Sequence, residues 1–428
     1  MKPTPHQYLL DVSQISHCLA CRGLAVLLLM AAAAPAWGQS QIVSSQVLEP
    51  TPEDRELSDP HVDVNFGAAV AVEGSTAAVG IPFVIVDDGY GPGRVGIYTK
   101  TEAGWIRTAT LLPTNTSDIR FGSDVELCGN LAIVAAENST YVFERSGALW
   151  RKIKRIGPPA PRRAVRGFAC SGDSFALSIG TLDRTQDRVH VYERCGDDFR
   201  QVAWLRASDP NDKIGRSLAM ERDILVAGSA PDGAYVFVRQ GHRWIEREKL
   251  QSAGPGDASI GSAVAIRDRI IIAGAPRVEF PVCYFPSCGP EGDAFVYLPS
   301  RGSWFESQSL NNPPRPLVRG FGSQVAMGRA LAAVVAPFNG DGVRPFSSVL
   351  AFDRIGAEFT LGRGVVGAGS DETIQDIDMS GRRLIVSVHE RFEGPGSRII
   401  GHAVIIEFEE SPEPLTQTDK EEAAADSP

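Results

Sequence analysis

Residues 66–82 read FGAAVAVEGSTAAVGIP, and residues 260–276 repeat the same plan as IGSAVAIRDRIIIAGAP. Each stretch holds two short runs rich in Val, Ile and Ala, separated by a turn of two or three residues. Short apolar, β-branched runs bounded by Gly, Asp and Pro are typical of β-strands buried in a sheet. The stretch therefore predicts a β-hairpin, and its recurrence along the chain decides the fold.

The same order of strands returns seven times. After the hairpin, each copy adds a third run such as GDAFVYL (residues 292–298) and a fourth such as WFESQSL (residues 304–310). Four strands at a period near 50 residues match the blade of a β-propeller, in which each small sheet is buried between its neighbours. We therefore predict an all-β fold, a seven-bladed β-propeller of four-stranded antiparallel blades. The copies begin at Phe66, Phe121, Ala164, Ile214, Ile260, Phe321 and Thr373.

The seventh copy lacks a fourth strand, because the chain turns acidic soon after HAVIIEF (residues 402–408). Residues 41–48, QIVSSQVL, precede the first copy and are similar to the fourth strand WFESQSL. We expect residues 41–48 to complete the last blade, so that both chain ends close the ring in one sheet and leave no open edge.

The start of the chain is expected to be a signal peptide. A basic residue precedes the 12-residue apolar run GLAVLLLMAAAA, and small residues at Ala36 and Gly38 suit cleavage after position 38. The run is shorter than the ~20 apolar residues that span a membrane, and a buried core helix is the alternative interpretation. Export to the periplasm or the extracellular space is favoured. The predicted parts are a signal peptide at 1–38, the propeller at 39–410 and a disordered acidic tail at 411–428.

The repeats resemble the FG-GAP repeats of bacterial exported proteins and of the integrin α-subunit propeller. The resemblance covers about residues 41–410 and implies the propeller fold and a role in binding. The FG element is present as Phe66-Gly67, Phe121-Gly122 and Phe321-Gly322, and as Ile-Gly at 214 and 260. The GAP element is present as Gly80-Ile81-Pro82, Gly228-Ser229-Ala230-Pro231, Gly274-Ala275-Pro276 and Ala336-Pro337.

The family resemblance also implies calcium, which such repeats often bind in an Asp-rich loop between the first two strands. The corresponding turns here, such as Glu73-Gly74-Ser75, lack that motif. They do not offer the 6–8 oxygen ligands that calcium takes. We therefore expect no cofactor and no metal.

Long loops between the second and third strands of blades 1, 5, 6 and 7 are predicted to share one rim. Loops on a rigid scaffold are where binding residues usually lie. We predict that a protein or glycan is recognised on this rim, with neutral insertion as the alternative. The candidate binding residues are Asp87, Asp88, Tyr90, Tyr284, Phe285, Asp341, His389 and Glu390.

Five cysteines remain after the predicted cleavage. Cys283 and Cys288 lie five residues apart in one loop and favour a disulfide over a metal site, because no other soft ligands lie nearby. Cys128 and Cys170 fall on neighbouring inner strands and could pair, which leaves Cys195 without an assigned partner.

The formal net charge of −10 argues against a nucleic-acid partner. Residues 151–166 are a basic exception, which we interpret as a solvated outer strand, with an anionic polymer or membrane surface as the alternative. No HExxH, GxSxG or Walker spacing points to an enzyme. We predict an exported, monomeric binding module. The alternatives are a propeller hydrolase or lyase acting on polysaccharide, and a structural envelope protein.

Overall fold

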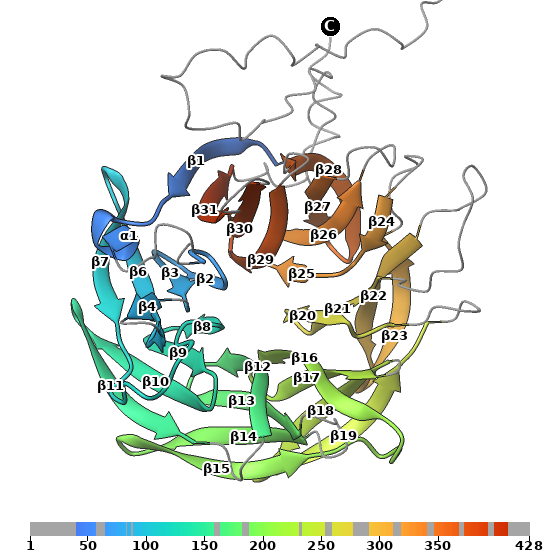
Figure 1. Cartoon of the computed structure of the whole chain (residues 1–428). Coiled ribbons are helices and arrows are strands. Elements are labelled where there is room, and N and C mark those ends of the chain that lie inside the picture. The colour runs from blue at the N-terminus through green and yellow to red at the C-terminus, as the bar shows by residue number, and fades with distance from the viewer. Residues whose placement is uncertain are drawn as a thin grey trace, which may run out of the picture.

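The structure, a computed structural model, describes residues 40–56, 65–82, 84–86, 89–157, 163–181, 188–230, 233–252, 259–276, 291–310, 318–339, 346–367, 372–392 and 398–409. In these ranges the chain forms one short helix and strands β1 to β31. The strands build small antiparallel sheets that radiate from a central channel (Figure 1). The predicted seven-bladed β-propeller is confirmed. No helix within the described ranges has both the length and the apolar character needed to cross a membrane.

Blades 1 to 4 follow one another along the chain, and each is a separate four-stranded sheet whose spatial order is the order in sequence. Blade 1 consists of β2 (Val70–Glu73), β3 (Thr76–Ile81), β6 (Arg94–Thr101) and β7 (Gly104–Leu111), with the hairpin β4 (Val84–Val86) and β5 (Gly89–Gly91) inserted after β3. Blade 2 consists of β8 (Val125–Cys128), β9 (Leu131–Ala136), β10 (Ser139–Ser146) and β11 (Leu149–Ile156). Blade 3 consists of β12 (Arg163–Ser171), β13 (Ser174–Thr181), β14 (Arg188–Cys195) and β15 (Asp198–Leu205). Blade 4 consists of β16 (Lys213–Glu221), β17 (Ile224–Ala230), β18 (Ala234–Gln240) and β19 (Arg243–Leu250).

Blades 5 and 6 are joined through a short parallel pairing of β22 with β24. Blade 5 consists of β20 (Ala263–Arg267), β21 (Ile270–Ala275), β22 (Glu291–Ser300) and β23 (Ser303–Ser309). Blade 6 consists of β25 (Val325–Met327), β26 (Leu331–Asn339), β27 (Phe346–Ile355) and β28 (Glu358–Gly367), preceded by β24 (Val318–Phe321). Blade 7 consists of β29 (Glu372–Ser380), β30 (Arg383–Phe392), β31 (Arg398–Phe408) and the N-terminal strand β1 (Ile42–Leu48).

The ring is closed by its N-terminal strand, as expected from residues 41–48. β1 pairs antiparallel with β31, and Gln46 lies opposite Ile405 (Figure 1). The Gln46 side chain then reaches blade 1, where its Nε2 donates to the Trp105 carbonyl oxygen at 2.8 Å and its Oε1 accepts from the Trp105 amide at 2.7 Å. Gln308 forms the same pair of bonds with the Phe359 backbone, at 2.6 and 2.9 Å, between blades 5 and 6.

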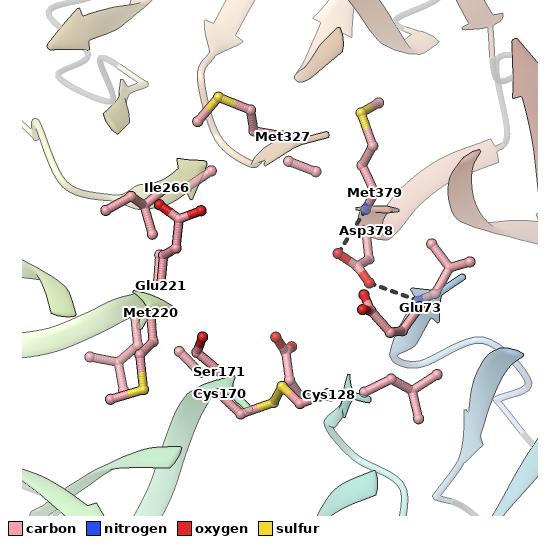
Figure 2. Close-up of a pocket in the computed structure, with 18 of the residues that line it drawn as sticks. Glu73, Cys128, Cys170, Ser171, Met220, Glu221, Ile266, Met327, Asp378 and Met379 are labelled. Atoms are coloured by element: carbon pink, nitrogen blue, oxygen red, sulfur yellow. Dashed lines mark hydrogen bonds between the residues drawn. A yellow bond between two sulfur atoms is a disulfide. The ribbon is translucent and has the colours of Figure 1, made fainter. Parts of the chain in front are cut away.

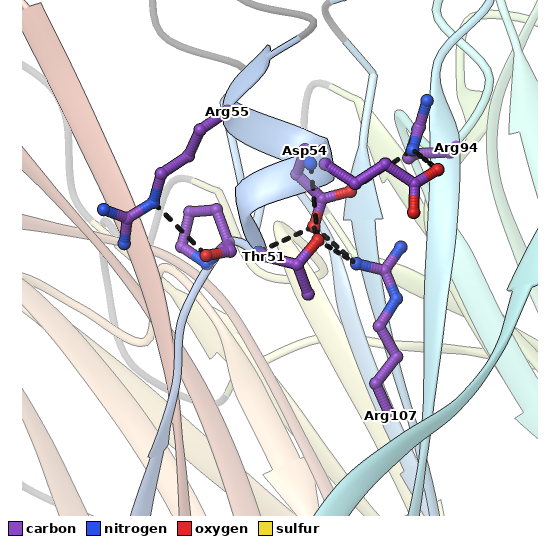
Figure 3. Close-up of polar contacts among 7 residues, drawn as sticks. Thr51, Asp54, Arg55, Arg94 and Arg107 are labelled. Atoms are coloured by element: carbon purple, nitrogen blue, oxygen red, sulfur yellow. Dashed lines mark hydrogen bonds and ion pairs between the residues drawn. The ribbon is translucent and has the colours of Figure 1, made fainter.

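A buried ion cluster anchors the segment that follows β1. The helix α1 (Pro52–Glu56) places Asp54, whose side chain is fully buried, against Arg107 and Arg94 of blade 1 (Figure 3). Burial opposes ionisation of Asp54, but hydrogen bonds from Arg107 and from Thr51 outweigh it and lower the pKa of the carboxyl group. The N-terminal segment therefore contacts both blade 7 and blade 1 and spans the seam where the ring closes.

The FG and GAP elements explain how neighbouring blades pack. Seven apolar clusters occupy the seven seams between blades, and Phe121 is fully buried in the cluster between blades 1 and 2. Gly122, which follows it, adopts a φ of +91°, where a side chain would be strained, and its amide donates to the Ala135 carbonyl oxygen at 2.8 Å. A Cβ on Gly80 of blade 1 would overlap the carbonyl oxygen of Gly122. Both glycines are therefore required by the close approach of two backbones.

Candidate functional site: the central channel

The innermost strands of the seven blades surround a cavity of about 320 Å³ (Figure 2). The cavity surface is mostly polar, with one strongly acidic sector where blades 7, 1 and 2 meet. Arg267 on β20 is the basic residue among the described lining residues. The acidic lining residues are Glu73, Asp124, Glu126, Glu221, Asp376 and Asp378.

Two of these carboxylates join blade 7 to blade 1. The amide of Val70 donates to Asp376 Oδ2 at 2.9 Å, and the amide of Val72 donates to Asp378 Oδ2 at 2.7 Å. One step further along, the amide of Gly74 donates to a side chain of β29 at its C-terminal end. Every second amide of β2 faces β29, and every second side chain of β29 offers an acceptor to it. These side chains take the place of the carbonyl groups that a neighbouring strand would supply in a continuous sheet.

Glu221 has the same role between blades 4 and 5. Its two carboxylate oxygens accept from the amides of Asp268 and Arg269, at 2.9 and 2.8 Å. The hydroxyl of Ser171 accepts from the amide of Arg222 at 2.8 Å, between blades 3 and 4. Side-chain acceptors near the channel therefore satisfy backbone donors at several seams, and this role holds them in fixed orientations.

Several carboxyl groups of the acidic sector have raised pKa values. Burial raises the pKa of Asp124 to about 7, although the amide of Val125 opposes the shift. Burial, reinforced by neighbouring carboxylates, holds the pKa values of Glu126 and Asp376 well above their ordinary range. Burial also raises the pKa of Asp378 to about 6, despite two hydrogen bonds from amides. These side chains face the small cavity but lie deep inside the ring. Some of their carboxyl groups are therefore protonated near neutral pH.

One group in the channel has the spacing of a metal site. A carboxylate oxygen of Glu126 and the sulfurs of Cys128 and Cys170 lie within 4.8 Å of one another. The two cysteines form a disulfide, with their Cα atoms 6.1 Å apart, between the inner strands of blades 2 and 3. Because thiolates are the metal ligands, the disulfide leaves only the carboxylate and does not fit a metal.

His389, a predicted rim residue, lies in the seam between blades 7 and 1. Its side chain is 5% exposed, and its Nε2 donates to the Phe66 carbonyl oxygen at 3.0 Å. Burial lowers the pKa of His389 to about 4, the carbonyl contact opposes this, and nearby His402 adds to it. The imidazole is therefore neutral near pH 7 and packs between blades instead of facing a ligand. Glu390 follows on β30 and is partly buried.

The other predicted binding residues cannot be placed against one another. Tyr90 belongs to β5, and nothing further is described of its side chain. Cys195 is exposed and unpaired at the end of β14. The remaining candidates lie outside the described residues: Asp87, Asp88, Tyr284, Phe285, Asp341, Cys283 and Cys288.

The channel carboxylates and the exposed Trp204 were not among the residues predicted from the sequence. The Asp residues of β29 alternate within TIQDIDM (residues 373–379), which places both on one face of an inner strand. That pattern could have indicated an acidic channel wall. By contrast, two tryptophans at the start of the fourth strand are buried, since Trp105 is 5% and Trp304 is 6% exposed.

No protein-family model and no curated protein matches this sequence. Among solved structures, a chain of the mitotic checkpoint complex is similar, with a TM-score of 0.52 and 11% identity over 87% of this chain and 94% of that chain. Sqt1 of Chaetomium thermophilum has a TM-score of 0.48 and 11% identity, over 79% of this chain and 94% of that one. The N-terminal domain of Nup159 has a TM-score of 0.45 and 9% identity, over 88% of this chain and 97% of that one. At 11% identity the likeness to the chain of the mitotic checkpoint complex shows the propeller fold alone.

Proposed function

We propose that this chain is an exported β-propeller that serves as a binding module for a protein partner. The observation that carries the proposal is that the channel carboxylates hydrogen-bond one blade to the next. Asp376, Asp378 and Glu221 accept backbone amides of neighbouring blades, so they maintain the ring and are not free for acid–base chemistry. Their fixed orientation suits a rigid scaffold, and rigid scaffolds commonly present binding loops.

Two further observations support this function and location. The FG element lies where neighbouring blades pack, with Phe121 buried between blades and Gly122 at a positive φ, which supports the resemblance to FG-GAP repeats. The Cys128–Cys170 disulfide is typical of proteins in oxidising compartments, which agrees with the signal peptide expected at residues 1–38. We place recognition on the rim that carries the loops between second and third strands.

The test is a pull-down from an extract of the source organism with the purified mature chain as bait. A variant in which residues 277–290 are replaced by a four-residue turn should lose the partner and keep its melting temperature. A second variant shortens the segment 340–345 of blade 6, whose loop is predicted to share this rim. Retention of the partner by both variants would contradict recognition on this rim. Cleavage of polysaccharides by the purified protein would contradict a purely binding function.

A further inference from the structure

We propose that the outer edge of blade 3, along β15, binds an extended acidic segment of a protein partner by adding a strand to the blade. This inference goes beyond recognition on the rim and rests on the proposal that the chain is a binding module. It concerns a surface on the outside of the ring, away from the rim loops.

The strand β15 has an open edge. In the described residues β15 pairs with β14 on one side, and it lies at the end of the sheet order and on the outer circumference of the ring (Figure 1). An outermost strand presents a row of amide and carbonyl groups that another extended chain can pair with. Every blade has such an edge, so the choice of β15 depends on its side chains.

The first distinguishing side chain is Trp204, which is 53% exposed. The guanidinium of Arg188 lies 5.0 Å from its ring centre, and that of Arg206 lies 4.9 Å away. These contacts hold a large apolar ring in place before any partner arrives, and the stacked guanidinium of the exposed Arg206 keeps its N–H donors in its plane for a carboxylate. Val202, two residues away, is also 44% exposed. Tryptophan and arginine side by side are typical of residues that dominate binding energy at interfaces.

The second distinguishing feature is charge. The chain has a net charge of −10, yet the neighbouring outer strand β11 carries four basic residues and no acid. β11 lies against β15, and Lys154 of β11 pairs with Asp198 of β15 at 2.9 Å. Arg151 on β11 and Arg206 beside Trp204 are also exposed. Arg155 of β11 is paired with Asp118, so the positive charge left for an acidic partner comes mainly from Arg151 and Arg206.

The backbone edge decides which acidic partner fits. An acidic polysaccharide could neutralise the arginines, but it has no amide or carbonyl row to pair with β15. An extended peptide with acidic and apolar side chains at alternate positions satisfies all three features. Its backbone pairs with the edge, its apolar side chains cover Trp204 and Val202, and its carboxylates meet the arginines.

The test uses a fluorescein-labelled peptide of about 12 residues that alternates Glu and Val, and fluorescence anisotropy with the full mature protein. Trp204→Ala should weaken binding about tenfold or more, as expected for a central interface residue. Phe305→Ala is the matched control, since Phe305 is 50% exposed on the outer strand of blade 5. It should change the affinity less than about twofold. Raising NaCl from about 50 to about 300 mM should also weaken binding.

Any of four results would overturn the inference. The first is equal affinity for a peptide with Lys in place of Glu. The second is equal affinity for a peptide with N-methylated alternate amides, which cannot pair with the edge. The third is absent peptide binding, and the fourth is stronger binding of polygalacturonate than of the peptide. Melting curves of each variant show whether it is folded. If the peptide fails but the loop-shortened variant still loses its partner, the edge inference falls and the rim function stands.

Discussion

Replacing Gln46 with alanine should destabilise the whole ring, because this side chain bridges the closing strand to blade 1. The variant loses two hydrogen bonds to Trp105, each worth about 1 kcal/mol net. It also leaves the backbone N–H and C=O groups of Trp105, which is 5% exposed, without their partner. This adds about 1 kcal/mol or slightly more to the loss of unfolding free energy. The expected loss is about 2–3 kcal/mol. With an unfolding entropy of about 2.1 cal/mol/K per residue over the ring at 39–410, the melting temperature should fall by about 3–4 °C.

Differential scanning calorimetry and urea unfolding measure this loss. Gln308→Ala removes the same bridge between blades 5 and 6 and should have a similar effect. Gln201→Ala alters an exposed glutamine on β15 and should change the free energy of unfolding by less than about 0.5 kcal/mol. A Gln46→Ala variant that matches Gln201→Ala would refute the bridging role. Unchanged melting after deletion of residues 39–50 would refute ring closure by β1.

Three further predictions concern packing, the disulfide and pH. Gly274→Ala should cost about 1–3 kcal/mol in urea unfolding, because the new Cβ would overlap the carbonyl oxygen of Gly322; an unchanged midpoint would contradict this backbone contact. Replacing Cys128 and Cys170 by serine should cost about 4 kcal/mol, from the chain entropy of a loop with a sequence separation of 42, and melting that is insensitive to reductant would contradict the disulfide. The pKa of Asp124 is raised to about 7 from 3.8, so its contribution to stability is present below about pH 4 and is lost as the pH rises through 7. The melting temperature should therefore fall between pH 5 and 8 more steeply in the natural chain than in Asp124→Asn, and parallel curves would contradict the raised pKa.

The ring itself could be predicted because its determinants are local and repeated. Each hairpin carries its own apolar strands, and Phe121-Gly122 recurs at the position where blades approach most closely. Even closure was predictable, because SQVL at residues 45–48 is similar to SQSL at 307–310. The likeness has a physical basis. Gln46 and Gln308 both bridge to the next blade, and the leucines that end these stretches are both buried.

The channel site was not predictable in the same way, because its members come from distant parts of the chain. Glu73 and Asp378 stand at opposite ends of the sequence, and only ring closure brings the Glu73 carboxylate close enough to add to the effect of burial in raising the pKa of Asp378. His389 was expected on the rim, but whether its side chain faces solvent or the next blade depends on the register of β30 against its neighbours. Composition and spacing do not determine that register.

Trp204 was missed for a different reason. Period-two counting along β15 places Arg200, Val202 and Trp204 on one face of the strand. The pairing with β14 shifts between Val191 and Tyr192, so that β15 carries one extra residue there. Such a bulge reverses the faces beyond it, and Trp204 then lies on the side of the sheet that faces blade 2. On that side its ring contacts Arg188 and Arg206.

These differences separate two kinds of residue in the ring. The channel carboxylates of β29 are bonded to amides of β2, so replacing Asp378 should lower stability while leaving binding by the remaining folded molecules intact. Trp204 is half exposed and contacts arginines at the surface, so its loss should change binding with little effect on the melting temperature. Side-chain acceptors in the channel hold this propeller together. Substitutions on its outer surface can therefore change binding without lowering the stability of the ring. This separation is why the outer edge of blade 3, rather than the acidic channel, is the better place to look for a partner.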